Sequence, residues 1–143
     1  MKKIVFILSI LVLLAATEKS FACSCMLNTK PLKTQVKEAF DSSGAVFSGE
    51  VLEITSKDEF AVNIKIKVAK SWKGNLSKEI IMTTAKDSSM CGYGFQVGQK
   101  YLVYAYGKME GLSTNICSRT TAAGNNPDIK YLDKLKKVKN KKS

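Results

Sequence analysis

Residues 60–68 read FAVNIKIKV, a stretch in which apolar and polar side chains alternate. Successive side chains of a β-strand point to opposite faces, so this alternation predicts a strand with one buried face. We expect Lys65 and Lys67 to face water. The residues expected on the core side are Phe60, Val62, Ile64, Ile66 and Val68.

Apolar runs bounded by turn residues predict further strands on both sides of this stretch. Residues 46–54 form one such run, in which Gly49 is a candidate β-bulge, and residues 80–84 form another. A turn at Lys73-Gly74-Asn75 separates 60–68 from 80–84. The chain from 101 to 118 predicts a hairpin, with strands 101–106 and 112–118 flanking a five-residue loop.

Two short helices are predicted outside the strands. Leu32, Val36 and Phe40 recur at every fourth residue, which indicates an amphipathic helix over residues 33–42. Asn126-Pro127 is a typical helix start, with an N-cap and a first-turn proline. Apolar residues then recur at every third position along a final helix, at Ile129, Leu132, Leu135 and Val138.

The predicted elements define a single domain in a chain of 143 residues, without repeats or a Pro- or Gly-rich linker. About five strands with peripheral helices indicate an all-β fold with small α content, in the form of a small closed or partly closed barrel. We expect a signal peptide over residues 1–22, one domain over 23–138 and a lysine-rich tail over 139–143.

The N-terminus has the pattern of a cleaved signal peptide. Lys2 and Lys3 precede an apolar run over residues 4–16, which is shorter than the roughly 20 residues of a membrane-spanning helix. Ser20-Phe21-Ala22 then offers small residues where a signal peptidase cuts. We therefore expect cleavage after Ala22, a free N-terminus on Cys23, and a secreted or periplasmic location.

Two other processing routes fit the N-terminal sequence less well. A retained anchoring helix is disfavoured by the length of the apolar run. A lipoprotein, with lipid on Cys23, is disfavoured because Ser20 occupies the place of a branched apolar residue. Glu18 and Lys19 also separate the apolar run from the cut.

The chain is strongly basic, with a net charge of +11. Removal of Lys2, Lys3, Lys19 and Glu18 leaves +9 (11 − 3 + 1). A lysine-rich C-terminus could attract nucleic acid or an anionic surface. It lacks interleaved aromatic residues and arginine, so we expect a solvated tail, with no nucleic-acid partner and no membrane contact after signal cleavage.

The chain has four cysteines and no histidine, which excludes the usual histidine-containing zinc sites and catalytic triads. A four-thiolate metal site is disfavoured because only Cys23 and Cys25 are close in sequence. In an exported protein, two disulfides that join this pair to later parts of the chain are the better interpretation. Such bridges could serve only to stabilise a small core.

The position of Cys23 permits a further role. If Cys23 is both N-terminal and bridged, its α-amine and carbonyl oxygen form a rigid five-membered chelate for a metal ion held by another protein. An α-amine ordinarily has a pKa of about 7.7–8.0, so a neutral fraction with a free lone pair exists near pH 7–8.

Several motifs occur in a fixed order along the chain: Cys23-Ser24-Cys25, Val46-Phe47-Ser48-Gly49, Trp72-Lys73-Gly74, Ser88-Ser89-Met90-Cys91-Gly92, Gly98-Gln99-Lys100-Tyr101-Leu102-Val103 and Asn115-Ile116-Cys117. As an ordered set they resemble the N-terminal domain of the tissue inhibitors of metalloproteinases, a netrin-like branch of the OB-fold, over residues 23 to about 135. The resemblance implies a five-stranded OB-fold barrel and the disulfides Cys23–Cys91 and Cys25–Cys117.

The resemblance also implies a site that inhibits zinc metalloproteases. The Cys23 amine and carbonyl would chelate the protease's zinc, and Ser24 would enter the pocket beside it. Cys25, Met26 and Leu27 would follow along the cleft, and Ser89 and Met90 would pack on the other side. On this interpretation the protein is a monomer that binds a zinc metalloprotease and has no cofactor of its own.

A second class of function stays open at this point. The domain could be an exported binding or adhesion module whose barrel face contacts another ligand, with no protease target. An enzyme is not expected, because the chain offers no histidine, no nucleophile with a base and no motif of paired carboxylates.

Overall fold

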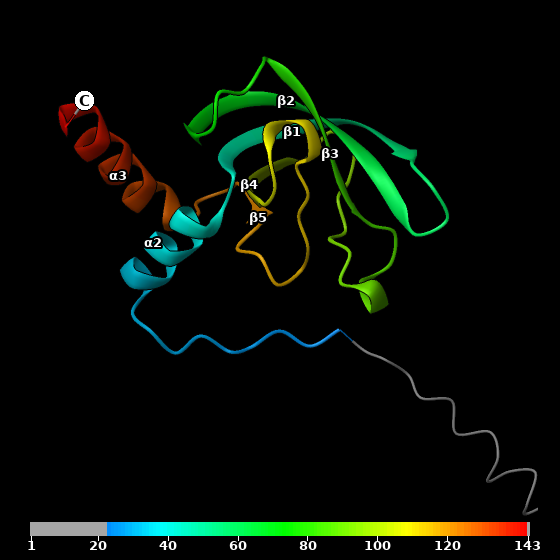
Figure 1. Ribbon diagram of the computed structural model, residues 1–143, viewed down its shortest axis with the longest axis horizontal. Coiled ribbons are helices and arrows are strands. Elements are labelled where there is room, and N and C mark those ends of the chain that lie inside the picture. Colours follow the sequence, from blue (N-terminus) through cyan, green and yellow to red (C-terminus); the bar gives the residue numbers. More distant parts are fainter. Residues whose placement is uncertain (1–22, 143) are drawn as a thin grey trace, which may run out of the picture.

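A computed structural model describes residues 23–142, and the side chains up to residue 138 (Figure 1). The predicted signal peptide, residues 1–22, lies outside the described residues, as does residue 143. The fold is mostly β, with one five-stranded antiparallel sheet in the order β3-β2-β1-β4-β5. The strands are β1 (Ala45–Ser56), β2 (Ala61–Lys73), β3 (Glu79–Ala85), β4 (Lys100–Ala105) and β5 (Thr121–Ala122).

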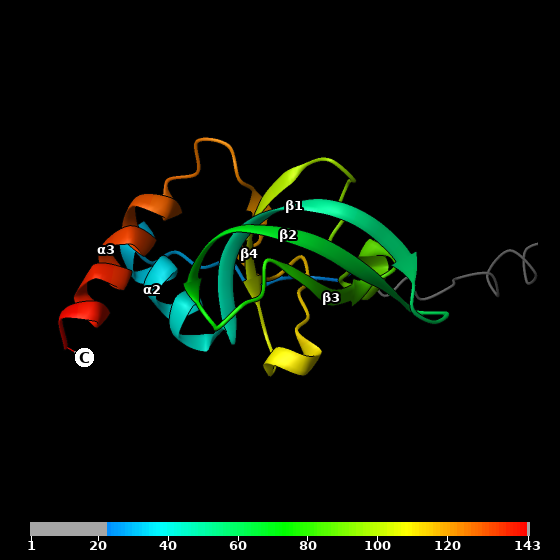
Figure 2. The same ribbon diagram turned by 90° about the horizontal axis from the view of Figure 1, so that it is seen from above.

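Two α-helices, α2 (Leu32–Ser42) and α3 (Asp128–Lys142), accompany the sheet. They lie together at one end of the molecule, away from the turn that joins β1 to β2 (Figures 1 and 2). Two short 3₁₀ turns, η1 (Ser88–Met90) and η2 (Met109–Gly111), lie in the loops. No helix in residues 23–142 combines the length and the apolar character needed to cross a bilayer.

The core lies on both faces of the sheet, because side chains alternate along each strand. One face is lined by Phe47, Ile64, Ile66 and Val103, with Met82 and Leu112. On the other face, β1, β2 and β4 contribute Val46, Trp72, Leu102 and Tyr104, which pack against Val36, Phe40 and Leu132 of the two helices. The predicted apolar faces of α2 and α3 cover the sheet, except that Val138 is 54% exposed.

The alternating stretch that starts β2 faces the core largely as predicted. Ile64 and Ile66 are 1% and 0% exposed, and Val62 and Val68 are half-buried against the same cluster. Lys67 faces solvent, as expected, and the Lys65 side chain is 41% exposed and pairs with Glu79 at 3.0 Å. The prediction for Phe60 is wrong: this residue precedes β2 in the turn and is 61% exposed.

Gly49 lies at an irregularity of the β1–β2 ladder, as predicted for a bulge. The register shifts between Ser48 and Gly49, and the extra residue is Ala69 on β2. A Cβ at Gly49 would collide with Ile66 and with the backbone oxygen of Lys67. Glycine thus permits close approach of the two strands at the shift.

The predicted strand over residues 112–118 is wrong for most of its length. Only Ser113 pairs, in an antiparallel bridge to Tyr106 and a parallel bridge to Thr83 at the edge of β3. Two bonds flank it, since the N–H of Thr83 donates to Leu112 O and that of Thr114 donates to Thr83 O. The sheet is not closed, and this short segment is what links β3 to the chain after β4.

The final helix begins as predicted and is longer than predicted. The side-chain oxygen of Asn126 accepts a hydrogen bond from the N–H of Asp128 at 2.9 Å, which is the expected cap. The helix runs to Lys142. The segment 139–143, expected to be a solvated tail, is therefore helical in its backbone through residue 142.

Candidate functional site

The seven residues predicted to form the inhibitory site come from two loops. Cys23, Ser24, Cys25, Met26 and Leu27 belong to an irregular segment that precedes α2, and Ser89 and Met90 belong to η1. The first segment runs along one edge of the molecule below the sheet (Figure 1). The two disulfides bring the loops together.

The disulfides are Cys23–Cys91 and Cys25–Cys117, each with a Cα–Cα distance of 5.2 Å. These are the pairs that the resemblance implies. The Sγ atoms of Cys23, Cys91 and Cys117 lie within 4.8 Å of one another, so the two bridges are adjacent. All four sulfurs are oxidised and offer no thiolate as a metal ligand.

Backbone geometry also holds the η1 loop against the loop that contains Cys117. Cys91 has a positive φ of 63° after η1, a left-handed conformation that turns the chain sharply. A Cβ at the next residue, Gly92, would overlap the carbonyl oxygen of Ala85. The carbonyl of Cys91 accepts a 3.0 Å hydrogen bond from Ile116, the neighbour of Cys117.

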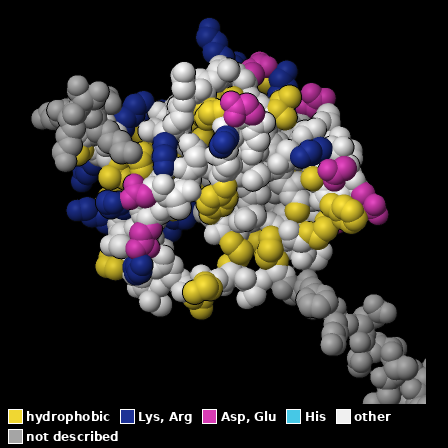
Figure 3. Space-filling view, viewed as in Figure 1, with side chains coloured by type: hydrophobic (Ala, Val, Ile, Leu, Met, Phe, Trp, Pro, Cys, Tyr) yellow, Lys and Arg dark blue, Asp and Glu magenta, His cyan; other side chains and the backbone are white. Residues whose placement is uncertain are grey.

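The segment after the cysteines exposes apolar side chains. Met26 is 98% and Leu27 is 95% exposed, and Met90 and Ile116 nearby are 39% and 36% exposed. Hydrophobic side chains gather at the corresponding edge in Figure 3. The seven residues that the sequence predicts to be inhibitory, Cys23–Leu27 with Ser89 and Met90, are called the inhibitory edge below. Neighbouring exposed apolar side chains make this segment a candidate contact surface.

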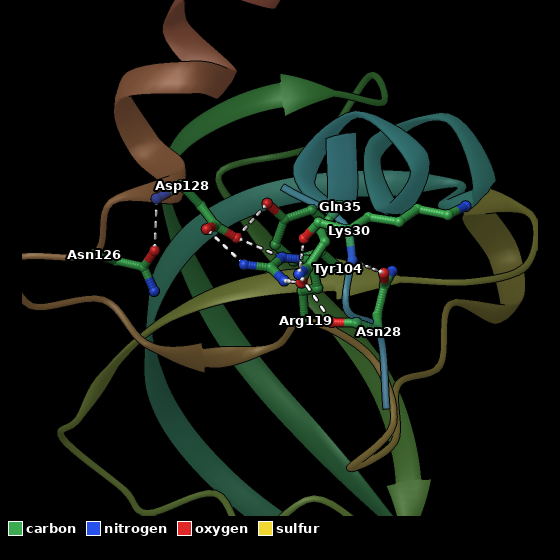
Figure 4. A network of polar contacts seen from close by, with 7 residues as sticks. All are labelled: Asn28, Lys30, Gln35, Tyr104, Arg119, Asn126 and Asp128. Carbon is green, nitrogen blue, oxygen red and sulfur yellow. Dashed lines mark hydrogen bonds and ion pairs between the residues drawn. The ribbon is translucent and has the colours of Figure 1, made fainter. Parts of the chain in front are cut away.

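A polar network joins α2, β4 and the start of α3 (Figure 4). The guanidinium of Arg119 donates to both oxygens of Asp128 at 2.8 Å, and the Tyr104 hydroxyl donates to the same carboxylate at 2.9 Å. Asp128 is 1% exposed. A bidentate pair with a further donor satisfies a carboxylate that would otherwise be costly to bury.

The network reaches the N-terminal segment through Gln35 of α2. Arg119 donates to the side-chain oxygen of Gln35 at 2.7 Å. The amide nitrogen of Gln35 donates to the backbone oxygens of Asn28 at 3.0 Å and Lys30 at 2.6 Å (Figure 4). The backbone just beyond Leu27 is therefore tied to the start of α3 through three side chains.

No motif in the sequence indicates this network. Arg119 is the only arginine among 23 basic residues, and its planar, bidentate geometry suits a buried carboxylate better than lysine does. The presence of a single arginine was the one feature of the sequence that pointed to such a pair. Nothing in the spacing of Gln35, Tyr104 and Asp128 indicates that they meet.

The network shifts the pKa values of Tyr104 and Arg119. Burial, together with the Asp128 carboxylate, raises the pKa of Tyr104 above its ordinary value. The hydrogen bond to Asp128 raises the pKa of Arg119. A neutral phenol is thus favoured by folding, so its stabilising contribution is present below about pH 10 and is lost as the pH rises through the folded-state value.

We expect Asp128→Asn to lower the free energy of unfolding by about 2–3 kcal/mol. It would leave the half-buried Arg119 without its counter-charge, and partial exposure keeps the effect below the about 3–5 kcal/mol of a fully buried pair. Tyr104→Phe removes one hydrogen bond and should cost about 1–2 kcal/mol. Urea unfolding at pH 7 measures both. Equal effects, or none for Asp128→Asn, would contradict the ion pair as the centre of the network.

No protein-family model and no curated protein matches this chain.

Proposed function

We propose that the mature protein inhibits zinc metalloendopeptidases through the inhibitory edge. Its Cys23 amine and carbonyl oxygen would chelate the protease's zinc ion and displace the zinc-bound water. The proposal requires export and cleavage after Ala22, a bond that joins Cys23 to residues outside the described part. The partner is a zinc metalloprotease, and the zinc belongs to that partner.

One observation carries the proposal: both cysteines of the N-terminal Cys-x-Cys are bridged, and the residues that follow project into solvent. The bridges tie Cys23 to the η1 loop and Cys25 to the loop after Ile116. A preorganised segment loses little conformational entropy on docking, which favours tight binding. Met26 and Leu27 supply apolar surface beside the chelating atoms.

We further propose that the sheet belongs to the OB-fold class as a partly open barrel. The support is Ser113, which pairs with both Tyr106 and Thr83. A closing strand in a five-stranded barrel has to contact two separate strand edges, and this segment does so over a single residue. The barrel would hold η1 and the Cys117 loop at one rim, where the two bridges meet.

The experiment that tests the function is an inhibition assay. The mature chain, with its N-terminus verified on Cys23 and both disulfides intact, is titrated against a panel of zinc endopeptidases. We expect stoichiometric inhibition of at least one zinc enzyme and none of serine or cysteine proteases. Absence of inhibition across the panel would favour an exported binding module without a protease target.

A further inference from the structure

A groove of ≈ 490 Å³ lies between α2 and α3, at the end of the molecule where the helices sit. Its apolar lining comes from Phe40 on α2 and from Tyr131, Leu135 and Val138 on α3. None of the inhibitory-edge residues lines it. Its volume falls in the range of about 300–1,000 Å³ that is typical of small-molecule sites.

The apolar residues that line the groove range from exposed to fully buried. Val138 is 54% exposed, Tyr131 and Leu135 are half-buried, and Phe40 is 1% exposed and part of the cluster beneath the helices. An elongated apolar ligand could therefore contact the exposed Val138 at one end of the groove and the buried Phe40 at its floor.

The rim of the groove is basic. The rim carries three lysines and one carboxylate. The lysines are Lys33 and Lys37 of α2 and Lys134 of α3, and the carboxylate is Asp41 of α2. Lys37 pairs with Asp41, an exposed pair of the kind that contributes little to stability and can be exchanged for another anion. Figure 3 shows lysine side chains gathered over this end of the molecule.

The charge of α3 as a whole also favours an anionic ligand. The sequence of α3 contains two aspartates, Asp128 and Asp133, and seven lysines: Lys130, Lys134, Lys136, Lys137, Lys139, Lys141 and Lys142. Asp128 is neutralised by Arg119, and Asp133 pairs with Lys70 and accepts from the Trp72 indole. Both acids thus already have a positively charged partner, and the lysines of α3 leave a net positive charge that attracts anions.

We propose that the groove between α2 and α3 binds a single amphiphile with a long apolar chain and an anionic headgroup. The chain would lie on Phe40, Leu135 and Val138, and the lysine rim would hold the headgroup. Insertion into an anionic membrane is the less suitable alternative. Val138 is the one large apolar side chain exposed on α2 and α3 within the described side chains, so little could enter a bilayer.

The test uses dodecyl phosphate below its micelle concentration, added to the isotope-labelled, disulfide-bonded protein starting at Cys23. We expect saturable 1:1 binding, with amide shifts confined to α2 and α3. Dodecyltrimethylammonium, with the same chain and the opposite charge, should bind at least tenfold more weakly, as should hexyl phosphate.

Two matched variants locate the site. Val138→Glu places a carboxylate in the groove and should weaken dodecyl phosphate binding at least tenfold. Val97→Glu makes the same change at a position outside the groove that is 60% exposed, and should leave the affinity unchanged. Both positions are exposed, so folding should survive both substitutions, and circular dichroism checks this.

Several outcomes would overturn the proposal. Non-saturating shifts spread over the lysines would indicate nonspecific charge attraction. Equal binding of both dodecyl compounds would remove the role of the lysine rim. Sedimentation with phosphatidylglycerol vesicles, without binding of monomeric dodecyl phosphate, would assign the basic end to a membrane surface.

Discussion

One alanine left in front of Cys23 is expected to reduce inhibition of a zinc endopeptidase by orders of magnitude. The added residue converts the α-amine into a peptide nitrogen, whose lone pair is delocalised and cannot bind zinc. It would also collide with the metal site of the protease. The melting temperature should barely change, because Cys23 lies in an irregular segment outside every helix and strand.

The control for this experiment is Ser24→Gly, which keeps the chelating atoms and changes only the side chain beside them. Ser24 is exposed, so the substitution should not affect folding. We expect a smaller loss of affinity and a changed preference among proteases. If the alanine-extended protein inhibits as tightly as the mature protein, zinc chelation by Cys23 is wrong.

Ile64→Asp is expected to lower the free energy of unfolding by about 4 kcal/mol or more, or to prevent folding. Ile64 is 1% exposed and packs in the cluster with Phe47, Val103 and Met82. The substitution removes buried apolar surface and forces a carboxylate into a region without a partner. Urea unfolding of the disulfide-bonded protein measures the loss.

Ala69→Asp provides the matched control on the same strand. Ala69 is exposed and is the extra residue at the register shift beside Gly49, so a carboxylate there remains in water. Its effect should stay within about 0.5 kcal/mol. An Ile64→Asp variant as stable as Ala69→Asp would show that the face assignment of β2 is wrong.

The features that follow from local pattern could be predicted from the sequence. Alternation places Ile64 and Ile66 in the core, and the four-residue spacing of Val36 and Phe40 places α2 on the sheet. Asn126 caps α3 because a side-chain oxygen reaches the free N–H groups at a helix start. Each of these depends on neighbours in sequence.

Three features could not be predicted from the periodicity of apolar residues. The chain after Gly111 has strand-like composition, but only Ser113 pairs, and β5 forms at Thr121–Ala122 instead. The side-chain oxygen of Asn115 accepts from the N–H groups of Cys117 and Ser118, which turns the chain there. Phe60 continues the alternation yet sits in the turn, where Asp58 accepts from its N–H. The Arg119–Asp128 pair depends on a close approach that no spacing rule describes.

The crossed order of the two disulfides has a consequence for biogenesis. The bridges span 68 and 92 residues and interleave along the chain. The N-terminal segment, although synthesised first, can therefore be crosslinked correctly only after Cys91 and Cys117 have been synthesised. Until Cys91 has been synthesised, the only partner for Cys23 is its neighbour Cys25. Long-range pairings of this kind raise the contact order and slow folding. A catalyst of thiol–disulfide exchange should therefore set the rate at which the native protein accumulates.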